Sequence, residues 1–521
     1  MTVREQLNSI AEERIIILDG AMGSLIQVLN LDEKSYRGSQ FADHPIPLQG
    51  CNDLLCLTRP GAIGVIHDTY LEAGADIIET CSFNSTSVSL SEYGLGHLSY
   101  DISKAAAQIA RKSADKFSAD SKPRFVAGSI GPTSKGASLY PDINNPAKRS
   151  ICWDELEAAY YDNARGLLDG GADIFLAETI FDTLNVKAAL FAISRLLEER
   201  QIDVPVIISA AISGESGRLL SGQSLEAFCI SVLHADPWAI GLNCSYNAPK
   251  LLPHLKLLSE NVPCFVSAYP NAGLPNKFGR YDEMPDVMAA NIEPYFEEKL
   301  VNIIGGCCGS SPAHIAAIAE KASGYAPRPI NRKWSGLTSF AGLEPCHSQD
   351  NLLFIDHAEK SAEREEFQKC LNNGEYEDAA DAARDLIENG ESILNIELKI
   401  NNPGTVCVIN SFLDYALMNP YISNAPFLIH CLDFNVLEAG LKRLQGRGLA
   451  GPVSLKAGEE QFLQKIRLIR RYGAAAIVTL ETDTSKDELE KRVCQLLEEN
   501  GIPLETVVFD RDYCPDADSA L

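Results

Sequence analysis

The first 320 or so residues alternate short apolar runs with segments of helical period, and this rhythm constrains the fold more than any other feature. Each run is rich in Ile, Val, Leu and Ala without polar alternation, as expected of parallel strands covered on both faces. The runs are Ile15–Gly20, Ala75–Thr80, Arg124–Ile130, Ala172–Thr179, Pro205–Ile212, Trp238–Ser245, Pro263–Pro270 and Val301–Cys308. Eight β/α units predict a TIM (β/α)8 barrel over residues 1–325, with an open doubly wound sheet as the alternative.

A second α/β segment follows a break in the pattern. Residues 326–350 carry prolines, glycines and mixed charge without periodicity, and we interpret them as a linker. Candidate strands then resume at Leu352–Asp356, Ser392–Leu398, Pro426–Leu432, Leu449–Leu455, Ala474–Leu480 and Thr506–Asp510. Parallel barrels close at eight strands, so residues 351–521 are predicted to form an open sheet or an incomplete barrel of about six strands.

Three cysteines stand where two predicted strands of the first barrel end. Cys244 closes Gly-Leu-Asn-Cys, and Cys307 and Cys308 lie within Gly-Gly-Cys-Cys-Gly. Strand ends converge on the mouth of a barrel, where three thiols make a zinc site with one position open for a substrate. Adjacent strand residues point to opposite faces, but the flanking glycines let the backbone bend so that both sulfurs turn inward. The alternative is that one or more of the three are core thiols.

Acidic side chains end other strands of the same barrel. Asp19, Glu79 and Glu178 close the first, second and fourth strands, and buried acids at such positions are costly unless they face a polar mouth. A ring of carboxylates suits a ligand ammonium group, although helix capping is the alternative. Further donors come from the side chains of Asn84 and Asn243 and from the backbone amides of Gly20 and Ala21. A charged amino acid that carries a thiol fits the whole set.

Composition excludes several classes of function. A net charge of −26 argues against nucleic-acid and anionic-membrane binding, and no apolar run is long enough to span a bilayer. The polar N-terminus and the odd count of 15 cysteines indicate a reducing cytoplasm. His234, His254 and His314 lie in helical stretches and are predicted to be surface or capping residues.

Seven phrases together resemble the homocysteine S-methyltransferase family. They are Asp19-Gly-Ala-Met-Gly, Ile78-Glu-Thr-Cys-Ser-Phe-Asn84, Gly131-Pro-Thr, Glu178-Thr, Gly241-Leu-Asn-Cys244, Tyr269-Pro-Asn-Ala-Gly273 and Gly305-Gly-Cys-Cys-Gly309. Two further phrases, Tyr36-Arg-Gly-Ser-Gln-Phe-Ala-Asp43 and Ala341-Gly-Leu-Glu-Pro345, narrow the resemblance to the N-terminal half of cobalamin-dependent methionine synthases. The resemblance implies zinc held by Cys244, Cys307 and Cys308. It also implies homocysteine bound by Asp19, Gly20, Glu178 and Asn243.

Residues 351–521 resemble the pterin-binding barrel of the same enzymes in scaffold but not at the strand ends. Scaffold phrases such as Gln445-Gly-Arg-Gly and Arg470-Arg-Tyr-Gly-Ala-Ala are kept. At the strand ends stand different phrases, which are Asp356-His-Ala-Glu-Lys360, Leu394-Asn-Ile-Glu397, Ile429-His-Cys431 and Asp510-Arg-Asp512. We therefore expect a degenerate domain that no longer binds folate productively and that acts in docking, stabilisation or self-association.

The resulting expectation is a zinc-dependent enzyme that methylates the thiol of homocysteine to make methionine. The chain shows no cobalamin-binding domain, so the resemblance implies methylcobalamin from a separate protein or free in solution. Two alternatives stay open. One is a methyltransferase that uses a small direct donor of the sulfonium or betaine kind, and the other is a non-catalytic binding or regulatory remnant.

Overall fold

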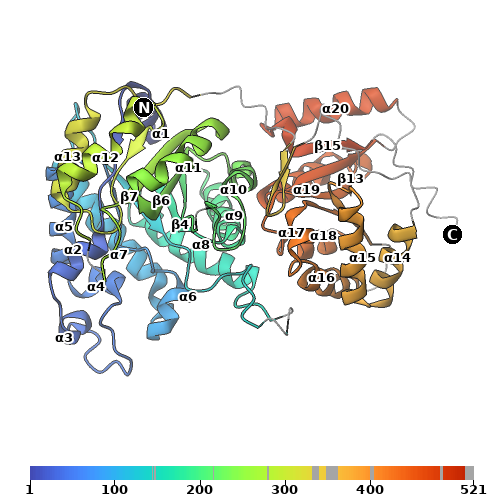
Figure 1. Cartoon of the computed structure of the whole chain (residues 1–521), viewed down its shortest axis with the longest axis horizontal. Coiled ribbons are helices and arrows are strands. Elements are labelled where there is room, and N and C mark those ends of the chain that lie inside the picture. The colour runs from blue at the N-terminus through green and yellow to red at the C-terminus, as the bar shows by residue number, and fades with distance from the viewer. Residues whose placement is uncertain are drawn as a thin grey trace. The chain divides into compact units, whose positions relative to one another are not determined.

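The computed structural model describes residues 1–142, 145, 148–214, 216–277, 281–330, 339–347, 362–398, 404–480 and 485–510. The chain divides into two compact units (Figure 1). The first contains residues 1–136, 154–221 and 236–334, and the second contains residues 137–153, 222–235 and 335–521. No helix in the described ranges is both long and apolar enough to cross a membrane.

The first unit is built on a closed eight-stranded parallel barrel, as the apolar runs predict. Its strands are β1 (Ile16–Ile17), β2 (Ile77–Glu79), β3 (Phe125–Ile130), β4 (Ile174–Ile180), β5 (Val206–Ala210), β6 (Ala239–Asn247), β7 (Phe265–Asn271) and β8 (Ile303–Ile304). They hydrogen-bond in the order β1-β8-β7-β6-β5-β4-β3-β2. A parallel bridge between Leu18 and Ile77 joins the two end strands and closes the barrel.

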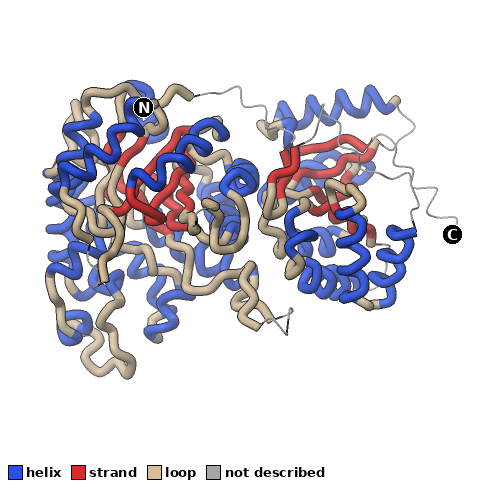
Figure 2. Tube along the Cα trace, viewed as in Figure 1, coloured by secondary structure: helices blue, strands red, loops and turns tan. Residues whose placement is uncertain are grey.

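Helices surround these strands because each crossover between parallel neighbours needs a covering element. Figure 2 shows the strands of the first unit gathered inside and its helices outside. The crossover helices of the first unit are α5 (Pro60–Glu72), α7 (Ser99–Phe117), α8 (Trp153–Asp169), α9 (Thr183–Arg200), α11 (Ala248–Asn261), α12 (Pro285–Glu297) and α13 (Pro312–Ala322). Helix α10 (Leu225–Val232) lies between β5 and β6 in the chain but belongs to the second unit. Shorter helices are α2 (Met22–Val28), α3 (Glu33–Arg37), α4 (Leu55–Thr58) and α6 (Ser87–Leu90).

Helix α1 (Val3–Glu13) closes the N-terminal end of the barrel. Its buried Leu7 and Ala11 belong to the same hydrophobic cluster as Trp238 and Phe265, at the starts of β6 and β7. The indole Nε1 of Trp238 donates to Asn8 Oδ1 at 2.8 Å. With this end sealed, the C-terminal end is the open mouth of the barrel.

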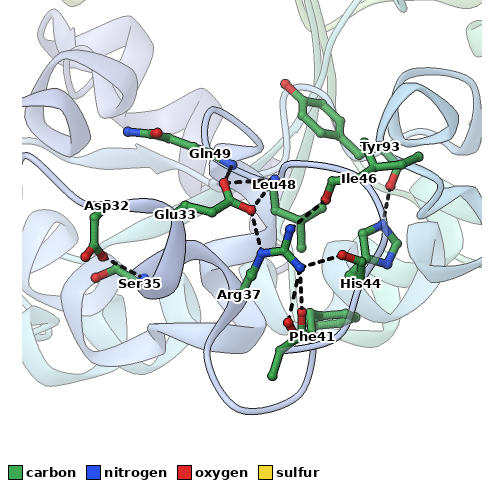
Figure 3. Close-up of polar contacts among 11 residues, drawn as sticks. Asp32, Glu33, Ser35, Arg37, Phe41, His44, Ile46, Leu48, Gln49 and Tyr93 are labelled. Atoms are coloured by element: carbon green, nitrogen blue, oxygen red, sulfur yellow. Dashed lines mark hydrogen bonds and ion pairs between the residues drawn. The ribbon is translucent and has the colours of Figure 1, made fainter.

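Residues 33–49, which lie between β1 and β2, are connected by hydrogen bonds of one arginine, Arg37 (Figure 3). The Arg37 guanidinium donates to Glu33 at 2.6 Å, and Glu33 in turn accepts from the amides of Leu48 and Gln49. Arg37 also donates to the carbonyls of Phe41, Ala42, His44 and Ile46. These hydrogen bonds satisfy loop carbonyl and amide groups that have no partner in a sheet. They therefore hold the segment in one conformation beside the barrel mouth.

The second unit contains a five-stranded parallel sheet and its helices. Its strands, in hydrogen-bonded order, are β11 (Leu394–Glu397), β12 (Phe427–His430), β13 (Leu449–Val453), β14 (Ala475–Thr479) and β15 (Val507–Asp510). The helices are α14 (Ala362–Asn373), α15 (Tyr376–Glu388), α16 (Thr405–Ala416), α17 (Pro420–Asn424), α18 (Phe434–Leu441), α19 (Glu459–Arg471) and α20 (Lys486–Glu499). A partial barrel is therefore present. The further predicted strand Leu352–Asp356 lies outside the described residues.

The segment predicted as a linker contains a short antiparallel pair, β9 (Ser339–Ala341) and β10 (Pro345–His347). Ala341 of this pair packs in one buried cluster with Ala227 and Ile230 of α10. Phe340 packs against the sheet residues Leu428, Leu449, Ala475 and Ile477. These contacts lie within the second unit, which thus includes α10 as well as Ala137–Trp153. No local pattern predicts that α10 belongs to this unit, because Ala341 comes more than a hundred residues after α10 in the chain.

Candidate active site

The structure brings the three predicted cysteines together at the barrel mouth. Cys244 lies near the end of β6, and Cys307 and Cys308 follow β8. The Sγ atoms of Cys244 and Cys308 are 3.4 Å apart, and all three sulfurs lie within 4.8 Å of one another. No other group of three His, Cys, Asp or Glu residues in the described part of the chain gathers its ligand atoms in this way.

Cys244 turns its thiol toward the site through a local distortion of β6. Its φ is +54°, a left-handed conformation that is strained for a residue with a side chain. The β6–β7 register shifts between Asn243 and Asn247, and the Asn271 side chain donates to the Cys244 carbonyl at 3.0 Å. A bulge of this kind re-aims a side chain at a barrel rim.

The glycines around Cys307 and Cys308 do what the sequence predicts of them. A Cβ on Gly305 would lie 2.8 Å from the Asp19 carbonyl oxygen, so only glycine lets β8 end this close to β1. Gly309 has a φ of +82°, which turns the chain away after the second thiol. The Cys307 amide donates to the Pro270 carbonyl, and the Cys308 carbonyl accepts from the Ala272 amide. Both cysteines are thereby tied to the end of β7.

The thiols titrate as a group. Hydrogen bonds from Cys244 and Cys307 lower the pKa of Cys308, so this thiol ionises first. Hydrogen bonds with Cys244 and Cys308, together with burial, raise the pKa of Cys307, since a second negative charge beside the first is costly. A bound cation removes that cost, and three thiolate sulfurs are a donor set that zinc prefers. The residues present therefore fit a zinc ion.

Glu178, near the end of β4, is one of two buried carboxyl groups at this mouth that the sequence predicts. Ser129 Oγ donates to its Oε1 at 2.5 Å, and the Tyr269 hydroxyl donates to its Oε2 at 3.4 Å. Burial raises the pKa of Glu178 to about 7. The two hydrogen bonds oppose this shift, and the neighbouring Cys308 adds to it.

Asp19 is the second buried carboxyl group, with a side chain only 2% exposed. Its Oδ2 accepts from the Glu79 amide at 3.0 Å, whereas its buried Oδ1 has no hydrogen-bond partner. Burial raises the pKa of Asp19 well above its usual range, the Glu79 amide opposes this, and the charge of Glu178 adds to it. A buried carboxylate oxygen without a protein donor offers an acceptor to a ligand donor.

Asn243 connects the thiols to β4. Its Oδ1 accepts from the Thr179 amide and from Ser209 Oγ. Its Nδ2 donates to Thr179 Oγ1 at 2.7 Å and to Cys307 Sγ at 4.0 Å. Asn243 is fully buried, and both ends of its side-chain amide form hydrogen bonds with other residues of the protein. In this structure it therefore holds the ends of neighbouring strands in place.

The other predicted residues take different places. Gly20 lies so close to Ser310 and Tyr70 that a Cβ would contact them at 2.7 and 2.9 Å. The Ala21 amide donates to Ser310 Oγ, and the exposed Asn84 donates its backbone amide to Asp53. His314 caps α13 together with Ser311, as the sequence predicts.

The sequence alone does not predict Ser129 and Tyr269 as partners of Glu178. Ser129 lies inside an apolar run, and Tyr269 stands in a phrase that carries the family resemblance without indicating a partner. Their positions on β3 and β7 become informative only when the barrel places both strands around Glu178. A polar residue inside an apolar barrel strand is the signal that would have found Ser129.

The fold and the site define a (β/α)8-barrel protein with a thiol centre and buried carboxyl groups at the C-terminal mouth. The chain belongs to the homocysteine S-methyltransferase family, whose model matches residues 16–322.

Two solved structures illustrate the similarity. The homocysteine methyltransferase MmuM from Escherichia coli in its metallated form is 21% identical, with 61% of this chain and 99% of that chain covered and a TM-score of 0.46. Its oxidized form is 22% identical, with coverages of 59% and 96% and a TM-score of 0.45. At these identities the chemistry of the site rests on the residues of this chain.

Proposed function

We propose that this protein transfers a methyl group to the thiol of homocysteine to make methionine, in a zinc-dependent reaction of the methionine synthase class. The observation that carries the proposal is the convergence of three thiols and two buried carboxyl groups at one barrel mouth. Membership of the homocysteine S-methyltransferase family supports the substrate and the reaction type.

Cys244, Cys307 and Cys308 would hold the zinc ion. Zinc with an open position supplies a Lewis acid that lowers the pKa of a bound thiol. The protein contributes the arrangement of the sulfurs, which the left-handed backbone of Cys244 and the glycines beside Cys307 and Cys308 impose. Asn243 fixes Cys307 through its contact with Sγ.

Asp19 and Glu178 would orient the ammonium group of homocysteine. The orphaned Oδ1 of Asp19 offers an acceptor that no protein donor satisfies. The carboxylate of Glu178 is held by hydrogen bonds from Ser129 and Tyr269 at the same end of the barrel as the cysteines. A substrate with an ammonium group at one end and a thiol at the other would engage both halves of the site, and the Gly20 amide is the proposed donor to its carboxylate.

We propose a cobalamin-borne methyl group as the donor, presented to this site by a separate protein or free. The test is zinc analysis of the purified protein followed by methyl transfer from methylcobalamin to homocysteine, with methionine as the readout. A protein with one zinc and no methionine formed would remove the cobalamin assignment.

A small direct donor is the second candidate. Three acidic side chains at the mouth, Asp19, Glu79 and Glu178, favour a cationic methyl donor of the sulfonium or betaine kind. Competition between methylcobalamin and such donors separates the two candidates. A regulatory remnant without catalysis would show no methyl transfer from any donor.

Homocysteine affinity is expected to rise with pH through about 7. Below its pKa of about 7 the Glu178 carboxyl is protonated and cannot pair with an ammonium group, and above it the carboxylate can. Well below the pKa the loss approaches about tenfold per pH unit. Calorimetric titration of zinc-loaded protein at several pH values measures the slope. Glu178→Gln should remove this dependence of homocysteine affinity on pH. If the dependence persists in the variant, a group other than Glu178 causes it.

The second unit is expected not to bind methyltetrahydrofolate with micromolar affinity. Strands β11, β12 and β15 end in Glu397, His430 and Asp510, where the pterin-binding resemblance leads one to expect other polar phrases. Each unmatched pterin donor or acceptor costs about 1–3 kcal/mol when buried. Calorimetry with methyltetrahydrofolate tests this, and homocysteine titration of the same sample is the control. Micromolar binding that maps to residues 351–521 would contradict it.

We also propose that the second unit supports self-association. Within the described residues, β11 and β15 are the two ends of its sheet, and an exposed edge strand is a template for pairing. A single monomeric species in sedimentation analysis across a wide concentration range would oppose this role.

A further inference from the structure

Strand β3 continues past the end of β2, and Ser129 lies in the part of β3 that β2 does not cover. The last hydrogen bond between the two strands runs from the Thr80 amide to the Ala127 carbonyl at 2.9 Å. Alternate residues of a strand direct their backbone groups to the same neighbour, so the amide and carbonyl of Ser129 face the side where β2 has ended. Ser129 is 1% exposed, and both of its backbone groups therefore need partners from the protein.

Two hydroxyl groups that follow β2 in the chain take the place of the missing strand. The Ser129 amide donates to Thr80 Oγ1 at 2.9 Å, and Ser82 Oγ donates to the Ser129 carbonyl at 2.7 Å. Thr80 Oγ1 and Ser82 Oγ are 2.6 Å apart. A hydroxyl group has one proton, and that of Ser82 is already donated, so Thr80 is the donor in this contact. The three residues thus form a closed ring of hydrogen bonds, which we call the hydroxyl ring.

The hydroxyl ring is buried and is itself held in place. Its three members are at most 3% exposed. Ser85 Oγ donates to the Ser82 carbonyl at 2.7 Å, which fixes the turn after β2. A Cβ on Gly131 would lie 2.2 Å from the Phe83 carbonyl oxygen, so β3 passes this turn at a distance that only glycine permits. The backbone of Ser129 is therefore fixed relative to the end of β2.

The hydroxyl group of Ser129 takes no part in the ring and has Glu178 as its partner. It donates its one proton to Glu178 Oε1 at 2.5 Å. The other carboxylate oxygen, Oε2, accepts from the Tyr269 hydroxyl at 3.4 Å, which is long for a hydrogen bond between two oxygens. Oε1 is thus held by the protein, and Oε2 is the oxygen that can accept from a ligand. The position of Ser129 therefore sets the direction in which Glu178 presents Oε2.

We propose that Ser129 is a positioning residue that aims Glu178 at the ammonium group of the substrate, and that the hydroxyl ring fixes Ser129 for this purpose. The inference rests on the proposed function and deepens it, because it names what selects a thiol that also carries an α-ammonium group. A carboxylate that rotates freely loses this freedom when it binds a ligand, which weakens binding. Glu178 is already held in one orientation before the substrate arrives, so its binding to the ammonium group does not incur that loss.

The test compares Ser129→Ala with the unsubstituted protein, both loaded with zinc. Calorimetric titration gives the dissociation constants of homocysteine and of 4-mercaptobutanoate, which is homocysteine without its amino group. The ratio of the two constants measures recognition of the ammonium group. We expect Ser129→Ala to weaken homocysteine binding about three- to tenfold, the factor for one hydrogen bond of ordinary net strength. Binding of 4-mercaptobutanoate and the zinc content should not change.

The matched control is Ser267→Ala. Ser267 is a buried serine on β7 of the same barrel, 1% exposed, and its Oγ has no hydrogen-bond partner. This substitution removes the same group from a strand of the same barrel without breaking a hydrogen bond, so the ratio should stay as it is. An unchanged ratio in Ser129→Ala would overturn the proposal. Equal weakening of both ligands would overturn it too, because that pattern means a general distortion of the mouth.

A second pair of variants, Thr80→Val and Thr80→Ser, tests the hydroxyl ring without changing Ser129. Valine has the shape of threonine but leaves the Ser129 amide without its acceptor, whereas serine keeps the hydroxyl group. We expect Thr80→Val to reduce the discrimination between the two ligands and Thr80→Ser to preserve it. Full discrimination in Thr80→Val would show that the ring does not control Glu178.

The same titrations separate this inference from the proposed function. An unsubstituted protein that binds homocysteine no better than 4-mercaptobutanoate would refute ammonium recognition and the role of Ser129 together. A protein that discriminates between the ligands but transfers no methyl group would refute the proposed reaction and leave the positioning role standing. Methyl transfer with the same discrimination in Ser129→Ala as in the unsubstituted protein would refute the role of Ser129 alone.

Discussion

Replacing Cys307 or Cys308 with alanine is expected to abolish zinc binding and to reduce methyl transfer by at least about a hundredfold. Each cysteine supplies one of three thiolates, and loss of a metal ligand should cost at least as much as the 10–100-fold typical of outer-shell partners. Zinc content by elemental analysis and methionine formation are the measurements. The two losses should appear together.

The fold is expected to survive this substitution, because the barrel closes through β1, β2 and β8 without any contribution from the metal. Circular dichroism and the melting temperature report on this. Cys264→Ala is the matched control, since Cys264 comes directly before β7 at the opposite end of the strand and should retain zinc and activity. A Cys307→Ala protein with full zinc would show that the thiols of this mouth are core residues.

Asp19→Asn is expected to weaken homocysteine binding roughly tenfold or more while zinc content stays the same. Oδ1 of Asp19 is the buried acceptor without a protein partner, and a charge-assisted hydrogen bond to it is worth about 1.5–3 kcal/mol. Asparagine keeps the size of the side chain and can still accept the Glu79 amide, but it carries no charge for the ammonium group. Calorimetric titration with homocysteine gives the affinity.

The matched control is Asp203→Asn. Asp203 is exposed and pairs with Arg4, so its loss changes the net charge equally without touching the mouth. Unchanged affinity in both variants would mean that Asp19 serves the structure of the strand end. A parallel loss of zinc in Asp19→Asn would mean that the carboxyl group supports the thiol centre instead of the substrate.

The strands and the barrel were predictable because a strand that is buried on both faces is rich in apolar residues and lacks polar alternation. Runs such as Phe125–Ile130 and Val206–Ala210 are buried along their whole length and apolar apart from Ser129 and Ser209, a pattern typical of parallel strands covered on both faces. The placing of Cys244, Cys307 and Cys308 at one mouth follows from topology, since parallel strands end on the same side. The predicted inward turn at Cys307 and Cys308 likewise follows from the glycines beside them.

Other features depend on contacts that no local pattern contains. The left-handed φ of Cys244 accompanies the bulge between β6 and β7, and the pKa of Glu178 is raised by burial among strands that are distant in sequence. In the same way, the place of α10 within the second unit rests on Ala341, more than a hundred residues away.

By itself, then, the sequence determined the barrel, the ends of its strands and the kinds of side chain that stand there. Periodicity and glycine spacing are local properties, because each determines the conformation of the same short segment in which it occurs. Tertiary structure alone decided which oxygen of Asp19 stays unpartnered and which side chains donate to Glu178. These outcomes depend on burial and on hydrogen-bond partners from distant segments, and both exist only after the chain has packed.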